Sequence, residues 1–172
     1  MRCTLVIATL FCIVIVSNCL SLDLVAYNKN KDTVSLYDST KLHFIVMVHT
    51  VGCSGCYVAL NRIVKYLSEE YDDIRYSVLI RCNTSKLSMK ESIIYFKPHI
   101  NIRDFLFDIH SDQKGTSDSE GIFPFYKVNY APTVLLTYKN KHLFLSYEKL
   151  FGEDQDSFAV IADAIRKIRN NP

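Results

Sequence analysis

The sequence predicts an α/β fold in which helices flank a mixed sheet. Residues 42–49 form an almost continuous apolar run, rich in Val and Ile, as expected for a strand buried on both faces. From Cys56 onward the apolar residues follow a helical spacing, and residues 76–82 are again typical of a strand. A strand, a helix and a second strand in this order indicate a parallel pair joined by a crossover.

Shorter segments add elements before and after this unit. Residues 33–36 are typical of a short strand. Ser88 and Glu91 fit a capping box, which predicts the start of a helix, and Pro98 should end that helix. Residues 104–109 predict a further strand after it.

The C-terminal part predicts a hairpin followed by a helix. Residues 133–138 and 142–146 flank the turn-like residues 139–141, which indicates two antiparallel strands. An amphipathic helix is predicted from about residue 154 to residue 169, with acids at its start and bases at its end, as the helix dipole favours. The sheet should therefore contain both parallel and antiparallel strands.

The composition is that of a single globular domain. The chain has 172 residues, of which 49% are hydrophobic and 22% charged, so it can bury a sizeable core. The formal net charge is +2, and acidic and basic residues are interspersed. Because no block of like charge is present, we expect no nucleic-acid partner.

Residues 1–21 predict a leader, which leaves residues 22–172 for the domain. Arg2 supplies the positive charge, and residues 5–16 are apolar but short for a membrane span, which disfavours an uncleaved anchor. The segment fits a cleaved signal peptide. It also fits a bacterial lipoprotein leader whose Cys19 is lipidated, although Asn18 is larger than the residue usual before that cysteine.

Either leader predicts an extracytoplasmic protein. In a bacterium it would lie in the periplasm or cell envelope, and acylation of Cys19 would attach it to the membrane. In a eukaryote it would be secreted or enter the lumen of the endoplasmic reticulum.

The candidate chemistry lies in Cys53-Ser54-Gly55-Cys56, at the junction of the apolar strand and the first helix. A thiolate is the form that attacks a disulfide, and a helix N-terminus stabilises it. Cys53 is therefore the candidate nucleophile, and Cys56, one turn further on, the candidate resolving thiol. An inert structural disulfide is the alternative interpretation.

A zinc site is a further alternative for these cysteines. It would need ligands in addition to Cys82 and His49, and the sequence holds no second close pair. We therefore expect neither a metal nor a cofactor. Cys82, a lone residue at a strand end, is expected to be a small buried hydrophobic side chain.

Several motifs occur in a characteristic order. Residues 32–38 (DTVSLYD) are followed by the apolar strand and CSGC, then by an insert holding a helix and a strand, and then by residues 126–133 (YKVNYAPT). This set, over about residues 30 to 170, resembles the thioredoxin superfamily. It is most similar to the extracytoplasmic TlpA and ResA branch, related to the AhpC/TSA group, which opens with a similar hairpin and carries a Y-x-V-x-x-x-P-T segment.

The resemblance implies a thiol–disulfide oxidoreductase, either a protein disulfide reductase or an isomerase. Pro132 would follow a cis peptide bond, and the backbone of Ala131 would face the cysteine pair and bind an extended substrate. The partners of the protein would be protein thiols or disulfides as substrates, and a redox-partner protein that exchanges electrons with the cysteine pair.

The sequence departs from this family at three positions near the pair. Gly52 replaces the usual Trp, Met47 occupies the position of a buried acid, and Ala59 that of an acid after the second cysteine. His49 remains as the candidate proton acceptor.

Two other functions remain open. The missing acid and Trp favour a binding module that has kept the fold without catalysis. A thiol peroxidase is also possible on sequence grounds, because Thr50-x-x-Cys53 is similar to the peroxidatic T-x-x-C. Val46, however, occupies the position where that motif has a proline.

Overall fold

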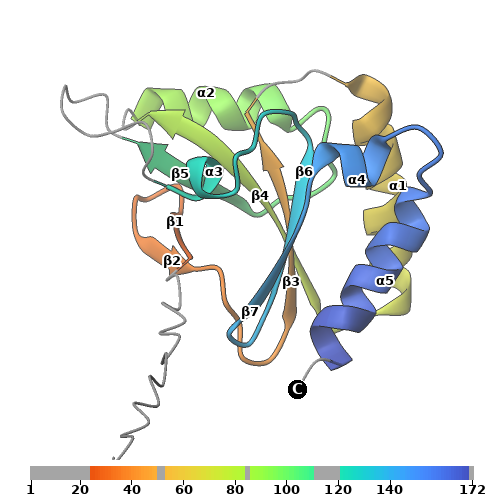
Figure 1. Ribbon diagram of the computed structural model, residues 1–172. Helices are drawn as coiled ribbons and strands as arrows, with labels where there is room; N and C mark the ends of the chain where they lie inside the picture. Colours follow the sequence, from red (N-terminus) through yellow and green to blue (C-terminus); the bar gives the residue numbers. More distant parts are fainter. Residues whose placement is uncertain (1–23, 50–52, 84–85, 111–120, 171–172) are drawn as a thin grey trace, which may run out of the picture.

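A seven-stranded mixed sheet forms the centre of the protein (Figure 1). The structure is a computed structural model that describes residues 24–49, 53–83, 86–110 and 121–170. The strands lie in the order β2-β1-β5-β4-β3-β6-β7. Their bounds are Val25–Tyr27 for β1, Thr33–Ser35 for β2, Leu42–Val48 for β3, Ile74–Asn83 for β4, Phe105–His110 for β5, Thr133–Tyr138 for β6 and Lys141–Leu145 for β7.

Five helices are present in the described part of the chain, and three of them have 11 or more residues. β3, β4 and β5 run parallel to one another, β6 is antiparallel to β3, and β1–β2 and β6–β7 are antiparallel hairpins. This confirms the predicted mixed sheet with flanking helices. The helices are α1 (Ser54–Glu70), α2 (Lys86–Phe96), α3 (Ile122–Phe125), α4 (Tyr147–Phe151) and α5 (Ser157–Asn170).

Both faces of the sheet are covered, which explains why β3 is buried along its whole length. Alternate residues of β3 enter two different cores, since side chains alternate across a strand. Phe44 and Val46 belong to the larger core, and Ile45 and Met47 to the smaller one. The continuous apolar run in the sequence is therefore the signature of a central strand.

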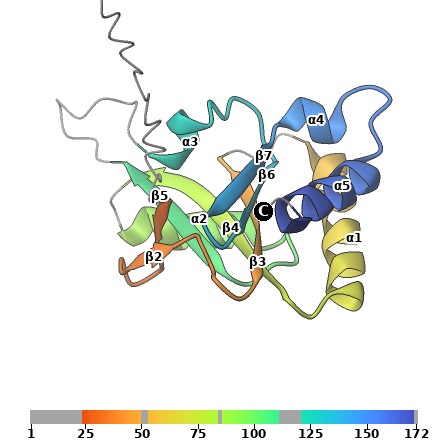
Figure 2. The same ribbon diagram turned by 60° about the horizontal axis from the view of Figure 1, so that its bottom comes forward.

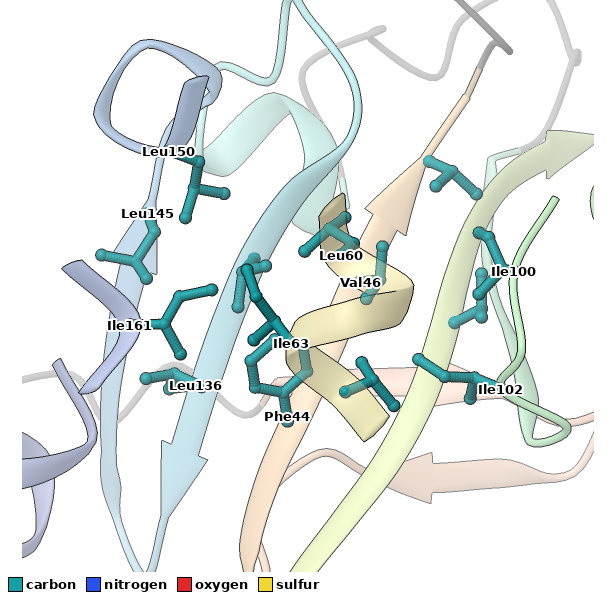
Figure 3. Close-up of a cluster of buried hydrophobic side chains, with 14 of the residues drawn as sticks. Phe44, Val46, Leu60, Ile63, Ile100, Ile102, Leu136, Leu145, Leu150 and Ile161 are labelled. Carbon is teal, nitrogen blue, oxygen red and sulfur yellow. The ribbon is translucent and has the colours of Figure 1, made fainter. Parts of the chain in front are cut away.

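The larger core lies under α1, α2 and α5. The connections from β3 to β4 and from β4 to β5 step in the same direction, so right-handed crossovers place α1 and α2 on one face. Both ribbon views show α5 beside α1 (Figures 1 and 2). In the close-up, Ile63 of α1 lies over Phe44, and Ile161 of α5 lies beside Leu136 (Figure 3).

The smaller core lies on the opposite face, under α3 and the N-terminal hairpin. Phe123 of α3 packs there with Leu24 and Leu36, which flank β1 and β2. These contacts fix α3 and the chain that follows it relative to β3. They therefore set the path of the segment that leads into β6.

Two predicted helix starts are wrong. α2 begins at Lys86, so Ser88 lies inside the helix and does not form the predicted capping box. Burial of Met89 and Phe96 in the larger core outweighs that local signal. α5 begins at Ser157, after Asp156, whose carboxylate accepts hydrogen bonds from the backbone N–H groups of Phe158 and Ala159.

Candidate active site

The cysteine pair lies where β3 leads into α1. Cys53 is the N-cap residue of the 17-residue helix α1, and its sulfur accepts a hydrogen bond from the backbone N–H of Cys56 at 3.2 Å. Cys53 and Cys56 form a disulfide with an S–S distance of 2.06 Å. The structure thus brings together the two cysteines that the sequence singled out, at the N-terminus of the predicted helix.

The two sulfurs have different surroundings. Cys53 is half-buried at the helix end, whereas Cys56 is only 6% exposed. The backbone N–H of Cys56 and the helix dipole both act on Cys53, and no acidic residue lies in the first turn of α1. A helix N-terminus of this kind stabilises a thiolate, and Cys53 is the less buried of the two cysteines.

Tyr147 contacts the inner cysteine. Its hydroxyl oxygen lies 3.5 Å from the sulfur of Cys56. Tyr147 is the first residue of α4, which begins at the N-cap Ser146. No sequence pattern singled it out, because the contact joins residues 91 positions apart.

The Ala131–Pro132 segment precedes β6 at the same end of the sheet as the pair. Its peptide bond is cis, as the resemblance implied. Thr133 begins β6 and pairs with Met47 near the end of β3, so Pro132 lies at the sheet end where α1 begins. The preceding residue, Tyr130, is 62% exposed, and its ring centroid is 5.9 Å from that of Tyr147.

His49, the candidate proton acceptor, follows β3. Its ring contacts Phe123 with centroids 6.1 Å apart, and the imidazole hydrogen-bonds to the backbone of Asn129. Burial and the nearby Arg81 lower its pKa below the usual value. The described contacts of His49 are thus with α3 and the loop after it, and its role as proton acceptor stays a prediction.

Cys82, near the end of β4, is 7% exposed and packs in the larger core, as predicted. Burial, with a contribution from the charge of Asp108, raises its pKa to about 11. A buried thiol with a raised pKa is a poor nucleophile. Its burial and its raised pKa both disfavour a nucleophilic role.

The other candidate positions fall into two groups. Cys19, Thr50 and Gly52 lie outside the described residues. Met47 is fully buried in the smaller core, and Ala59 is half-buried on α1. Neither of these two supplies a proton acceptor for Cys56.

Within the ranges that the structure describes, no three or more His, Cys, Asp or Glu residues come together as a metal site. In the same ranges, no helix has the length and apolar character needed to cross a membrane.

No protein-family model and no curated protein matches the sequence. Solved structures do match it. A thioredoxin-like protein from Porphyromonas gingivalis is similar over 85% of this chain and 89% of that chain, with 14% identity and a TM-score of 0.56. The chain has a thioredoxin-like fold.

Two further structures with this fold come from distant sources. A thioredoxin-like protein from Aeropyrum pernix covers 84% of this chain with 89% of its own, at 7% identity and a TM-score of 0.54. An exposed lipoprotein thioredoxin from Streptococcus pneumoniae covers 84% of this chain with 98% of its own, at 15% identity and a TM-score of 0.50. The thioredoxin-like fold that the motifs predicted is confirmed.

Proposed function

We propose that the protein is a thiol–disulfide oxidoreductase that cycles Cys53 and Cys56 between dithiol and disulfide on protein substrates. The observation that carries the proposal is the asymmetry of the pair. Cys53 is half-buried at a helix N-cap with an N–H group directed at its sulfur, and the more deeply buried Cys56 is joined to it by the disulfide. This arrangement provides an accessible nucleophile and a protected resolving thiol.

The reaction proceeds through a mixed disulfide. The Cys53 thiolate attacks one sulfur of a substrate disulfide, and the other substrate sulfur leaves as a thiolate that takes up a proton. Cys56, as a thiolate, then attacks the Cys53 sulfur and releases the second substrate thiolate. The substrate has gained two electrons, and a redox-partner protein must return two electrons to the Cys53–Cys56 disulfide. If Cys56 does not intervene, another thiolate of the substrate attacks the mixed disulfide. A new substrate disulfide then forms, the Cys53 thiolate leaves, and the substrate has been isomerised.

Ala131 and Pro132 form the proposed docking segment. They precede β6 at the sheet end where α1 begins, so an extended substrate beside Ala131 would have its sulfur close to Cys53. Pro132 has no N–H group, so this position does not compete for the substrate's carbonyl groups. The exposed ring of Tyr130 offers apolar surface to the same substrate.

We further propose that residues 1–21 form the leader and residues 22–172 the thioredoxin-like domain, and that the protein works outside the cytoplasm. The apolar stretch in residues 5–16 and the following Cys19 support this. Disulfide exchange on secreted proteins is the chemistry such a compartment requires. Attachment through a lipidated Cys19 would keep the domain at the membrane surface.

Insulin reduction with dithiothreitol tests the activity. Dithiothreitol supplies the electrons, and we expect the protein to accelerate precipitation of the insulin chains. Cys53→Ser should abolish the acceleration, because no mixed disulfide can form at that position. Cys82→Ala should retain it, because Cys82 is a buried thiol of the larger core with a raised pKa.

A non-catalytic binding module is the second candidate, and the apolar Met47 and Ala59 near the pair favour it. Insulin precipitation at the rate of dithiothreitol alone, for both the unmodified protein and Cys53→Ser, would support that candidate and contradict the first. Peroxide consumption that depends on Cys53 would instead support a thiol peroxidase.

A further inference from the structure

The inner sulfur of the pair has one hydroxyl group as a described neighbour. The hydroxyl oxygen of Tyr147 lies 3.5 Å from the Cys56 sulfur. A disulfide sulfur carries no hydrogen, so in this state the tyrosine O–H must be the donor. The Tyr147 hydroxyl is thus already in place to donate to Cys56 when that sulfur becomes negatively charged.

A thiolate on Cys56 needs such a donor. Cys56 is 6% exposed, so water gives little stabilisation to a charge there. The free N–H group at the start of α1 is directed at Cys53 and not at Cys56. Met47 and Ala59, on β3 and α1, are apolar and offer no compensating group.

The surrounding packing holds the Tyr147 ring in place. Its centroid lies 5.4 Å from that of Phe151 and 5.9 Å from that of Tyr130, so the ring has an aromatic neighbour on α4 and another on the segment leading to β6. Leu150 of the same helix is fully buried in the larger core. A donor held by this packing loses little conformational freedom when the charge develops.

We propose that Tyr147 is a catalytic residue that stabilises the Cys56 thiolate by hydrogen bonding, an inference that rests on the oxidoreductase function proposed above. When an incoming thiolate attacks Cys53, a new sulfur–sulfur bond forms to Cys53 and the Cys53–Cys56 bond breaks. The electron pair of that bond remains on Cys56, and the Tyr147 O–H donates to it.

The same contact acts in the opposite direction. Cys56 loses its proton to solvent or to the departing substrate thiolate and attacks Cys53 as a thiolate. Tyr147 keeps its own proton throughout. It therefore lowers the energy of the one charged intermediate that both directions share, and leaves the driving force of the overall exchange to the two redox partners.

Tyr147→Phe tests the proposal, since it removes the hydroxyl and keeps the ring. We expect oxidised Tyr147→Phe to be reduced by dithiothreitol about three- to tenfold more slowly than the unmodified protein, because a hydrogen bond to a charged group is lost. The rate is followed by alkylating free thiols with iodoacetamide at set times and counting the added groups by mass spectrometry. Tyr66→Phe is the matched control, because Tyr66 lies on α1 and is 49% exposed.

A pH profile separates this role from packing. In a Cys53→Ser background, the alkylation rate of Cys56 against pH reports the pKa of that thiol alone. We expect Tyr147→Phe to raise this pKa by about half a unit to one unit. Tyr147→Phe could also lower the unfolding midpoint. Val160→Ala is the control for that effect, because it removes a side chain on α5 that packs against the larger core. The pKa of Cys56 in Val160→Ala should stay at its value in the unmodified protein.

The outcomes distinguish this inference from the function on which it rests. If the protein reduces insulin but Tyr147→Phe leaves both the reduction rate and the Cys56 titration unchanged, the role of Tyr147 is wrong and the oxidoreductase function stands. If insulin reduction fails while Tyr147→Phe still shifts the Cys56 titration, the hydrogen bond is real and the proposed function is wrong.

Discussion

At the scale of single residues, the three described cysteines should differ in reactivity because their environments differ. Cys53 is half-buried at a helix N-cap, Cys56 is more deeply buried, and Cys82 is buried with a pKa raised to about 11. In the reduced protein at mildly acid pH, iodoacetamide should therefore label Cys53 first. Peptide mass spectrometry after brief exposure measures the order.

Unfolded protein serves as the control for this labelling, since the three thiols should then react at similar rates. Equal labelling of Cys53, Cys56 and Cys82 in the folded, reduced protein would show that the helix N-terminus gives Cys53 no advantage. The nucleophile would then have to be assigned again.

Asp38 predicts a pH dependence of stability. Its Oδ1 accepts hydrogen bonds from the backbone N–H groups of Thr40 and Lys41 and from the Thr40 hydroxyl. These hydrogen bonds lower the pKa of Asp38 from 3.8 to about 2, and the bond from the Thr40 backbone contributes most. Because the folded pKa is the lower one, the stabilisation is complete above about pH 4 and is lost as the pH falls toward 2.

Asp38→Asn should accordingly lower the free energy of unfolding at pH 7 by about 1 kcal/mol, since solvent screening limits the effect of this partly exposed group. Near pH 2 the variant and the unmodified protein should converge. Urea unfolding at both pH values measures this, with Asp72→Asn, at an exposed turn, as the control for charge. A difference that is the same at both pH values would contradict the explanation.

The candidate site was predictable where its chemistry is local in the sequence. Cys53 and Cys56 were found because their spacing and the helix start lie within one short stretch. Tyr147 was missed because its contact with Cys56 joins two helices far apart in the sequence, which no periodicity encodes. His49 was chosen for its nearness in sequence to Cys53, but the described contacts of its ring are with Phe123 and Asn129.

At the scale of elements, α3 depends on the glycine before it. Gly121 has a φ of 113°, and a Cβ added there would lie 2.8 Å from Oδ1 of Asp108. The same carboxylate accepts a hydrogen bond from the backbone N–H of Phe123. Gly121→Ala should therefore destabilise the protein by about 1–3 kcal/mol, measured by urea unfolding.

Gly55→Ala is the matched control for this substitution. A Cβ at Gly55 meets no atom within 4 Å, and the residue lies in α1, where alanine is favoured. We expect it to be neutral or to stabilise the fold by up to about 1 kcal/mol. Equal losses from both substitutions would mean that the backbone at Gly121 is not under the constraint described.

The long elements were predictable, whereas three of the short ones were not. β3, α1 and β4 carry enough consecutive residues for their apolar spacing to be unambiguous. β1, α3 and α4 contain three, four and five residues, which is too few for a period to emerge. The packing of neighbouring elements, more than their own sequence, maintains such short segments.

At the scale of the whole molecule, the proposed leader would decide where the domain works. If Cys19 is lipidated, Cys19→Ser should move the protein from the membrane fraction to the soluble fraction, because an acyl chain can no longer be attached. Fractionation and immunoblotting measure the distribution, and insulin reduction by the variant should be unchanged. A soluble distribution for both proteins would indicate an ordinary cleaved signal peptide.

The sheet also imposes an order on folding. β1 pairs with β5 through Tyr27 and Phe107, and β3, α1, β4 and α2 all lie between them in the chain. During synthesis the β1–β2 hairpin is therefore made long before β5, the strand with which β1 pairs. Until then Leu24, Ala26 and Leu36, fully or almost fully buried in the finished protein, remain open to water. The N-terminal hairpin thus stays unpaired with the rest of the sheet until β5 has been made, and its apolar side chains expose a surface prone to aggregation in the meantime.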